Sequence, residues 1–190
     1  MEQNSHHKEA LVNQIREAFG RITYSYTTHL KFMNRLILKN KAIKHMQIAL
    51  SAISTGGFIG SLITNEFMIS LIGGLIAAML LTINLYYKDF KLFDEIELHR
   101  LASDKLWLIR EQHISLLTDA QVLSCDKIVS LRDNLQIKTH EVYSQSPKTD
   151  EKSYAAAQKA LKDGGEQHFT ERELDKMLPN HLRKDRSEMY

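Results

Sequence analysis

Two long stretches without charged residues lie in the middle of the chain and set its pattern. The first (46–63) has 18 residues and the second (67–86) has 20. Each is long enough for a helix to cross a hydrocarbon core of about 30 Å. A buried helix pair in a soluble domain would show the same pattern, but a chain of 190 residues offers little protein to cover it. The pattern therefore predicts a transmembrane hairpin over residues 45–87.

An amphipathic helix is predicted ahead of the hairpin, within residues 1–44. Its apolar positions follow one another in steps of three and four, as expected for one face of a helix. They are Leu11, Ile15, Ala18, Ile22, Tyr26, Leu30, Met33 and Ile37. Gly20 lies inside this segment and weakens the helix locally.

Two further helices are predicted between residues 88 and 146. The first has alternating four-residue and three-residue steps, typical of packed or coiled-coil helices. Its seam is Ala102, Leu106, Ile109, His113, Leu116, Ala120 and Leu123. The phase then slips, which predicts a break between Thr118 and Asp126 with Ser124 as an N-cap. The seam resumes with Ile128, Leu131, Leu135, Lys138 and Val142.

The remaining segment, residues 147–190, is predicted to hold two short helices. Pro147 interrupts the preceding pattern, and an alanine-rich helix then runs from about Asp150 to Lys162. Thr170 and Glu173 have the spacing of a capping box for a last helix that ends at Leu178. No strand pattern is present. The expected fold is an all-α membrane protein, with a two-helix transmembrane hairpin and long cytoplasmic helices before and after it.

The distribution of charge predicts the orientation of the hairpin. Residues 1–44 hold eight Lys and Arg against three Asp and Glu, whereas the connection 64–66 holds no cation. By the positive-inside bias we expect both termini to be cytoplasmic. The lysines closest to the spans either bind anionic lipid headgroups or only set this topology. They are Lys39, Lys41, Lys44 and Lys88.

Catalytic and metal-binding motifs are missing from the sequence. It contains no nucleophile elbow, phosphate loop, paired cysteines or two-histidine zinc motif. Glu97 and His99 are two residues apart and so lie on different helix faces. The basic segment has no interleaved aromatic residues, which argues against nucleic-acid binding. We therefore expect no enzyme activity, no cofactor, no metal and no nucleic-acid partner.

Small residues recur every four positions in both predicted spans. They are Ala52, Gly56 and Gly60 in the first span, and Ser70, Gly74 and Ala78 in the second. Such faces let helix backbones approach closely. The same residues would serve either packing within one hairpin or assembly into a homo-oligomer, and the sequence does not separate the two.

A polar stripe accompanies the small residues of the first span. It consists of Gln47, Ser51, Ser54, Thr55 and Ser61. Polar groups at this depth need partners or water. They form hydrogen bonds between helices or face a water-filled pore in an oligomer. No charged residue lies inside either span, which argues against a dedicated ion pump.

The chain resembles the SLATT domain family, the two-span effector domains associated with bacterial nucleotide-signalling defence operons. The resemblance extends from about residue 15 to residue 183. The segments that carry it are 38–41, 50–58, 106–111, 132–135 with Tyr143, Pro147 and Thr149, then Tyr154, Ala157 and Leu161, and 169–171 with 174–179. Gly164 and Gly165 stand where the family has a polar or acidic helix end.

The resemblance implies a membrane effector that oligomerises and forms a pore or otherwise breaches the inner membrane, with abortive infection as the outcome. It also implies control by a separately encoded nucleotidyltransferase, sensor or reverse transcriptase, or by a cyclic nucleotide that acts on the cytoplasmic helices. Arg100, Lys105 and Arg110 could bind a phosphorylated messenger, but their spacing equally fits a solvated helix face. The alternative function is a membrane anchor whose cytoplasmic helices recruit partners.

Overall fold

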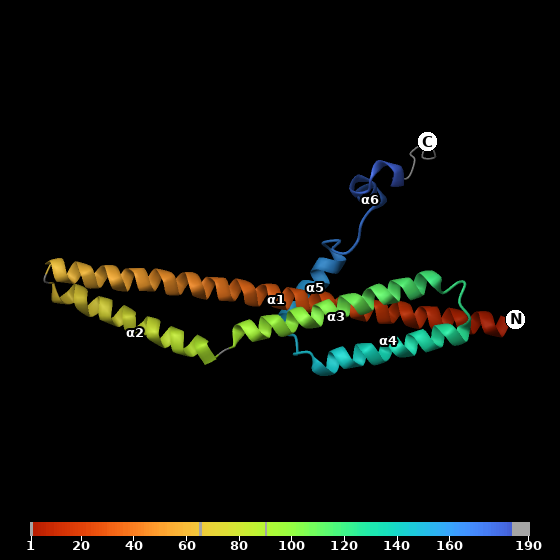
Figure 1. The fold of residues 1–190 in the computed structure, drawn as a ribbon, viewed down its shortest axis with the longest axis horizontal. Helices are drawn as coiled ribbons and strands as arrows, with labels where there is room; N and C mark the ends of the chain where they lie inside the picture. The colour runs from red at the N-terminus through yellow and green to blue at the C-terminus, as the bar shows by residue number, and fades with distance from the viewer. Residues whose placement is uncertain (1, 65, 90, 184–190) are drawn as a thin grey trace.

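The computed structural model describes residues 2–64, 66–89 and 91–183, and within these ranges all regular structure is helical (Figure 1). The elements are α1 (Glu2–Thr64), α2 (Phe67–Asp89), α3 (Leu92–Asp119), α4 (Cys125–Gln145), α5 (Glu151–Lys162), α6 (Glu171–Met177) and the short 3₁₀ helix η1 (Asn180–Leu182). The predicted fold class is confirmed.

Helix α1 contains both the predicted amphipathic helix and the first predicted span. It has 63 residues, and it continues without a break through Gly20 and through the predicted boundary between residues 44 and 45. At 1.5 Å per residue it is about 95 Å long, roughly three times the thickness of a hydrocarbon core. One continuous helix therefore joins the N-terminal end of the molecule to the end of the first span.

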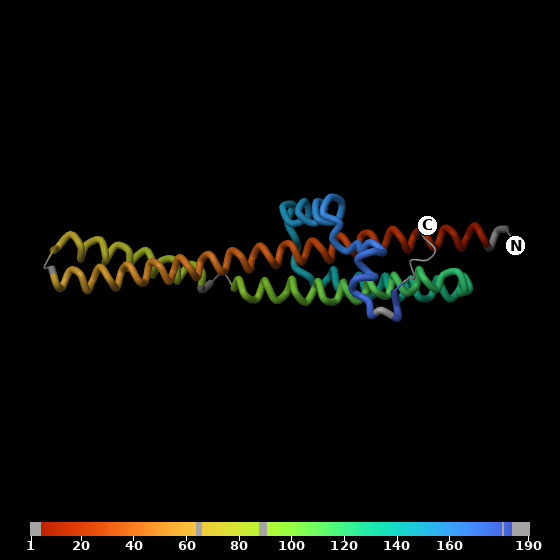
Figure 2. Tube along the Cα trace, turned by 90° about the horizontal axis from the view of Figure 1, so that it is seen from above, coloured from red at the N-terminus to blue at the C-terminus, as the bar shows by residue number. Residues whose placement is uncertain are grey.

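The other long helices pack along α1 in two groups. Helix α2 runs back along the second half of α1, and α3 continues along its first half, as Figures 1 and 2 both show. Helix α4 then folds back and contacts both α3 and α1, while α5 lies on α1 alone among the principal packing partners. The result is a narrow hairpin at one end and a thicker bundle of α1, α3, α4 and α5 at the other.

The core along α1 has two parts. In one, Phe32, Leu36 and Ile43 pack with Leu92 of α3, whereas the predicted Leu30, Met33 and Ile37 are half-buried. The other part is formed by residues that the spacing predicted. Leu11, Ile15 and Ile22 of α1 pack with a buried row on α3 and α4. That row is Leu106, Ile109, Leu116, Ala120, Ile128, Leu135 and Val142. Leu131 and Lys138 differ from the prediction, because both are exposed. The buried residues of α4, Ile128, Leu135 and Val142, are seven residues apart, so only a narrow face of α4 contacts the bundle. Leu131 and Lys138 lie beside that face.

The predicted helix ends are confirmed by their caps. Helix α3 ends at Asp119, and Ser124 caps α4 by accepting a hydrogen bond from the Lys127 N–H. Thr170 and Glu173 form the full capping box of α6, whose C-cap is Leu178. The first backbone N–H groups of a helix have no partner within the helix. These capping side chains accept hydrogen bonds from them, which fixes where each helix begins.

Candidate functional site: the transmembrane hairpin

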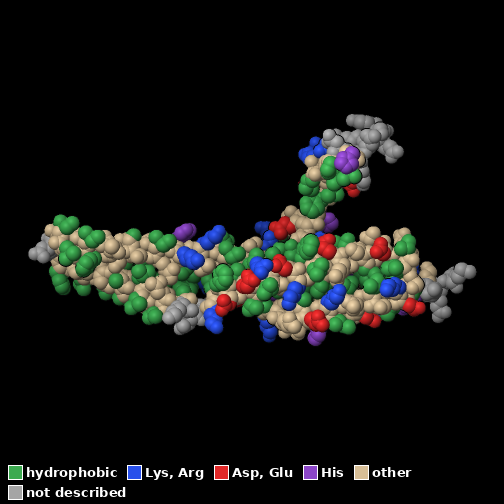
Figure 3. Space-filling view, viewed as in Figure 1, with side chains coloured by type: hydrophobic (Ala, Val, Ile, Leu, Met, Phe, Trp, Pro, Cys, Tyr) green, Lys and Arg blue, Asp and Glu red, His purple; other side chains and the backbone are tan. Residues whose placement is uncertain are grey.

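The hairpin of α1 and α2 has an apolar surface with almost nothing covering it. Two helices of the structure are long and apolar enough to cross a membrane, and only 6% of the apolar window in each is buried. Large side chains are open to the surroundings, among them Ile63 (80% exposed) and Phe67 (75%). The core helix of a soluble domain would be mostly buried. On the visible face of the space-filling view, this end shows hydrophobic side chains and no charged ones, and the cations begin toward the bundle (Figure 3).

The two spans meet through a pair of glycines that the sequence analysis did not select. A Cβ atom built on Gly57 would lie 3.8 Å from the Cα of Gly73. A Cβ on Gly73 would lie 3.7 Å from the Phe58 nitrogen and the Ser54 oxygen. The missing side chains thus allow the two backbones to approach closely, as small residues do between transmembrane helices.

Polar side chains supplement this glycine contact. Gln47 donates a hydrogen bond of 2.8 Å to the Asn84 side chain across the hairpin, and the Ser54 hydroxyl donates to the Gly73 carbonyl at 3.3 Å. Ser61 donates to the Phe58 carbonyl of its own helix at 2.8 Å. Three members of the predicted polar stripe therefore have partners within one hairpin. Ser51 and Thr55, the other two, are exposed.

The predicted small-residue faces lie away from the Gly57–Gly73 contact. Ala52, Gly56, Ser70, Gly74 and Ala78 are exposed, and Gly60 is half-buried. A Cβ atom built on Gly56, Gly60 or Gly74 would meet nothing within 4 Å. We call the exposed pair Ala52 and Gly56 the outer face of α1. Its use in self-association stays a prediction.

A shallow groove connects the exposed polar residues to the second span. Ser54, Thr55, Phe58, Ser70, Gly73, Gly74 and Ala77 line a depression of about 370 Å³. A neighbouring depression of about 810 Å³ is lined by Ser51, Thr55, Ala52 and Gly56 together with Gln47 and Asn84. Small side chains and hydroxyls thus share one flank of the hairpin. Lys44, just before the first span, also lines the larger depression.

The lysines near the spans are placed as a membrane boundary requires. Lys39, Lys41 and Lys44 are exposed on α1 within two turns of the first span. Lys88 stands near the end of α2, and its side chain lies outside the described residues. Binding of these cations to lipid headgroups stays a prediction.

The cations proposed for a messenger on α3 mostly have protein partners. Arg100 forms ion pairs with Glu97 at 2.6 Å and Asp104 at 2.7 Å, and the Glu97 hydrogen bond raises the arginine pKa. Arg110 is paired with Glu111 and lies over the Phe19 ring. Lys105 is exposed. The two arginines are therefore engaged in ion pairs on the surface of α3, and the three cations do not form a cluster that converges on one site.

Three buried histidines lie in the bundle next to the hairpin. His29 of α1 and His99 of α3 share a hydrogen bond of 2.8 Å between their Nδ1 atoms, and the Phe32 ring stacks on His99 at 4.2 Å. Burial, followed by the nearby His99, lowers the pKa of His29 to about 4. Burial also lowers the pKa of His99, although Asp150 opposes this, and the pKa of His113, whose ring is hydrogen-bonded to the Ile109 carbonyl. All three side chains are neutral at pH 7.

Acidification is expected to destabilise the bundle. Between the ordinary histidine pKa of 6.5 and the lowered value of about 4 for His29, the unfolded chain binds more protons than the folded chain. The free energy of unfolding therefore falls as the pH drops through this window, and the contribution of His29 by pH 5 is about 2 kcal/mol. The melting temperature of the chain in neutral detergent should be lower at pH 5 than at pH 7.5.

The His29→Gln variant should show a smaller fall in melting temperature over the same pH range, whereas His140→Gln, at an exposed position, should fall as much as the wild type. Equal falls in all three proteins would contradict a role for the buried pair.

The comparisons with known proteins agree with this architecture. The family model described as "SMODS and SLOG-associating 2TM effector domain family 4" matches residues 11–173, which includes the hairpin, the bundle and the start of α6. No curated protein and no solved structure matches the chain. The family match covers most of the chain and agrees with the resemblance seen in its motifs.

Proposed function

The chain belongs to the family of SMODS and SLOG-associating 2TM effector domains, and from this premise we propose that it breaches the membrane by assembling its hairpins into a pore. Membership makes it a defence-associated membrane effector, of a family that is not a known catalytic one. The pore, its oligomeric state and its trigger are our proposal.

The observation that carries the proposal is the division of the hairpin into two kinds of surface. Gly57 and Gly73 complete the packing inside one hairpin. The outer face of α1 and the hydroxyls of Ser51 and Thr55 are left over, exposed at a depth where water is absent. In lipid, small faces favour contact with another helix, and unpartnered hydroxyls favour another helix or a water-filled space. Association of several hairpins would satisfy both.

Orientation and control are further parts of the proposal. The exposed lysines at the bundle end and the absence of Lys and Arg from residues 64–66 favour the inner membrane with both termini cytoplasmic. The bundle of α1, α3, α4 and α5 would then face the cytoplasm. A separately encoded nucleotidyltransferase, sensor or reverse transcriptase would govern it, and the family's association with SMODS systems favours the first of these. Growth arrest of the infected cell would be the outcome.

The second candidate function is a membrane anchor whose cytoplasmic helices recruit partners. The bundle gives it some support, because apolar side chains such as Trp107 (49% exposed) and Leu108 (53%) lie on its surface. An anchor, however, would not need exposed glycines and hydroxyls in its spans.

Exchange of the hairpin separates the two functions. Residues 45–87 are replaced by an unrelated two-span hairpin of the same length and charge, and growth is followed while the defence system is active. A pore-forming effector should lose growth arrest although the exchanged protein still reaches the membrane. Full growth arrest with the foreign hairpin would refute the pore and favour the anchor.

A further inference from the structure

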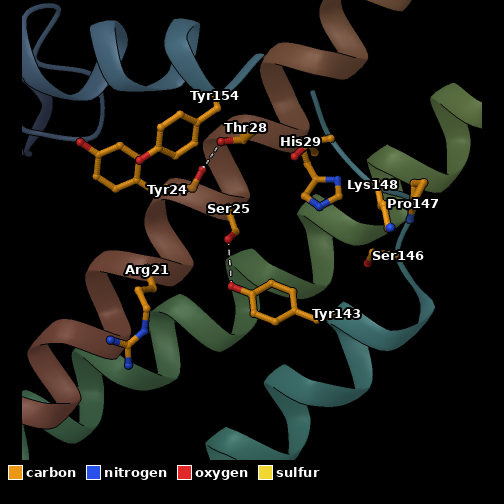
Figure 4. Close-up of a pocket in the computed structure, with 11 residues that line it drawn as sticks. Arg21, Tyr24, Ser25, Thr28, His29, Tyr143, Ser146, Pro147, Lys148 and Tyr154 are labelled. Carbon is orange, nitrogen blue, oxygen red and sulfur yellow. Dashed lines mark hydrogen bonds between the residues drawn. The ribbon is translucent and has the colours of Figure 1, made fainter. Parts of the chain in front are cut away.

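The cytoplasmic bundle contains a polar pocket about 700 Å³ in volume, far from the hairpin. Its floor is one face of α1, formed by Arg21, Tyr24, Ser25, Thr28 and His29. Its walls are Tyr143 of α4, the connection 146–149 and Tyr154 of α5. Figure 4 shows the two groups of residues facing each other across the pocket. The volume lies within the usual range for small-molecule sites.

The charge of this pocket is positive, and its lining contains no carboxylate. Arg21 and Lys148 belong to different elements and lie toward opposite ends of the pocket (Figure 4). His29 is buried and neutral, so it adds no charge of its own. Among the described residues, the Arg21 side chain pairs with the exposed Glu17 at 3.5 Å, a weak pair that a stronger anion can displace. Arginine and lysine in such an arrangement favour a phosphorylated ligand.

The same pocket offers an aromatic surface and many hydroxyl groups. The rings of Tyr24 and Tyr154 stack with centroids 5.9 Å apart and planes at 30°. Tyr154 is still 51% exposed, so part of its ring remains open to a further flat group. Tyr143 and Ser25 hydrogen-bond to each other at 2.8 Å, joining α4 to α1. A planar base can stack on such a ring irrespective of its identity.

The wall that carries Lys148 is fixed at both ends. Ser146 closes α4, because its hydroxyl donates to the Val142 carbonyl at 2.6 Å. Asp150 caps α5 by accepting from the Ser153 N–H at 2.9 Å, and it also forms an ion pair with Arg35 of α1. The connection is thus held against α1 while Lys148 and Thr149 stay exposed. A site held in this way loses little freedom when it binds a ligand.

We propose that this pocket binds a nucleotide with more than one phosphate group, with one phosphate on Arg21, another on Lys148 and a base against Tyr154. Arg21 lies 25 residues before Met46 on one unbroken helix, a distance of about 38 Å at 1.5 Å per residue, so lipid headgroups do not reach it. The regulatory meaning of the site rests on the proposed function, since a ligand that joins α5 to α1 acts on the helix that enters the membrane. Binding itself does not depend on the pore.

Binding is tested on the full chain, purified in neutral detergent, by titration calorimetry with AMP, ATP, cyclic di-AMP, cyclic di-GMP and inorganic phosphate as separate probes. At least one nucleotide should bind saturably, and Arg21→Gln or Lys148→Gln should weaken it tenfold or more. Tyr154→Leu should weaken nucleotides tenfold without changing the response to inorganic phosphate. Lys152→Gln, which removes the same charge from an exposed position of α5 outside the pocket lining, is the matched control and should bind as the wild type does.

Failure of all four nucleotides to bind would overturn the proposal. Equal weakening of nucleotide binding by Lys148→Gln and Lys152→Gln would overturn it too, because the effect would then follow from the overall charge of the protein and not from the pocket. Selective binding of a phosphotyrosine peptide in place of every nucleotide would overturn it as well. None of these outcomes bears on membrane breaching, so the pocket and the pore are tested separately.

Discussion

Replacement of Gly56 by leucine is expected to abolish growth arrest while leaving each hairpin folded. Gly56 lies on the outer face of α1, where a Cβ atom would meet nothing within 4 Å in the same chain. A leucine there is accommodated within the monomer but keeps a second hairpin from approaching closely. Growth during activation of the defence system and self-association by chemical crosslinking in membranes are the two measurements.

Ile53→Leu is the matched control for Gly56→Leu, since residue 53 is also exposed in the first span and already carries a large apolar side chain. This control should arrest growth and crosslink as the wild type does. If Gly56→Leu still arrests growth and crosslinks, the outer face has no role in self-association, and the membrane anchor becomes the favoured function.

Replacement of Gly73 by leucine is expected to separate the two spans. The Cβ atom alone would already be in van der Waals contact, 3.7 Å from backbone atoms of Phe58 and Ser54, so the further atoms of a leucine side chain must be accommodated at the contact between the two helices. Overpacking of this kind costs about 1–3 kcal/mol, and it would also break the Ser54 hydrogen bond to the Gly73 carbonyl. The thermal stability of the hairpin in detergent should fall by several degrees, as followed by helical circular dichroism.

Two variants make the Gly73 experiment specific. Gly73→Ala adds only the Cβ atom and should keep near wild-type stability. Gly74→Leu places the same large side chain one residue further on, where a Cβ atom meets nothing within 4 Å, and should not lower the melting temperature. A fall of equal size in Gly73→Leu and Gly74→Leu would show that the glycine contact does not hold the spans together.

The sequence was sufficient to predict the elements whose signals are local. The charge-free stretches gave the hairpin, the spacing of apolar residues gave the bundle core, and Ser124, Asp150 and Thr170 marked helix starts with side chains that cap only there. These features depend on the residue and its near neighbours. The spacing was wrong in two places. Leu131 and Lys138 are exposed because α4 presents only a narrow face to its partners, and in the second half of α1 Phe32 and Leu36 are buried in place of the predicted Met33 and Ile37.

The contacts inside the hairpin were harder to predict because several small residues could have served. Gly56 and Gly57 are adjacent, and four-residue repeats selected the first, whereas the structure brings the second against Gly73. The signal that distinguishes them is the alternating spacing of Gln47, Leu50, Ser54, Gly57 and Ser61, the half-buried or buried positions of the seam. Asn84 was not predicted either, because its hydrogen-bond partner Gln47 lies 37 residues away in the sequence.

The pocket between α1, α4 and α5 could not be predicted from the spacing of residues. Ser25 and Tyr143, which meet in it, are 118 residues apart, and Tyr24 stacks on a residue of a third helix. Only the folding of α4 and α5 back onto α1 brings the two cations and the tyrosines together. Cations on a single helix, such as Arg100, instead found their partners within a turn.

The most direct test of a hairpin that opens the membrane is the membrane potential of cells that express the chain while its defence system is active. A potential-sensitive dye is read in single cells for the wild type and for the chain with the exchanged hairpin, at equal amounts of protein in the membrane. The account predicts rapid depolarisation, before growth stops, in wild-type cells only. An unchanged potential in wild-type cells that nevertheless stop growing would contradict it.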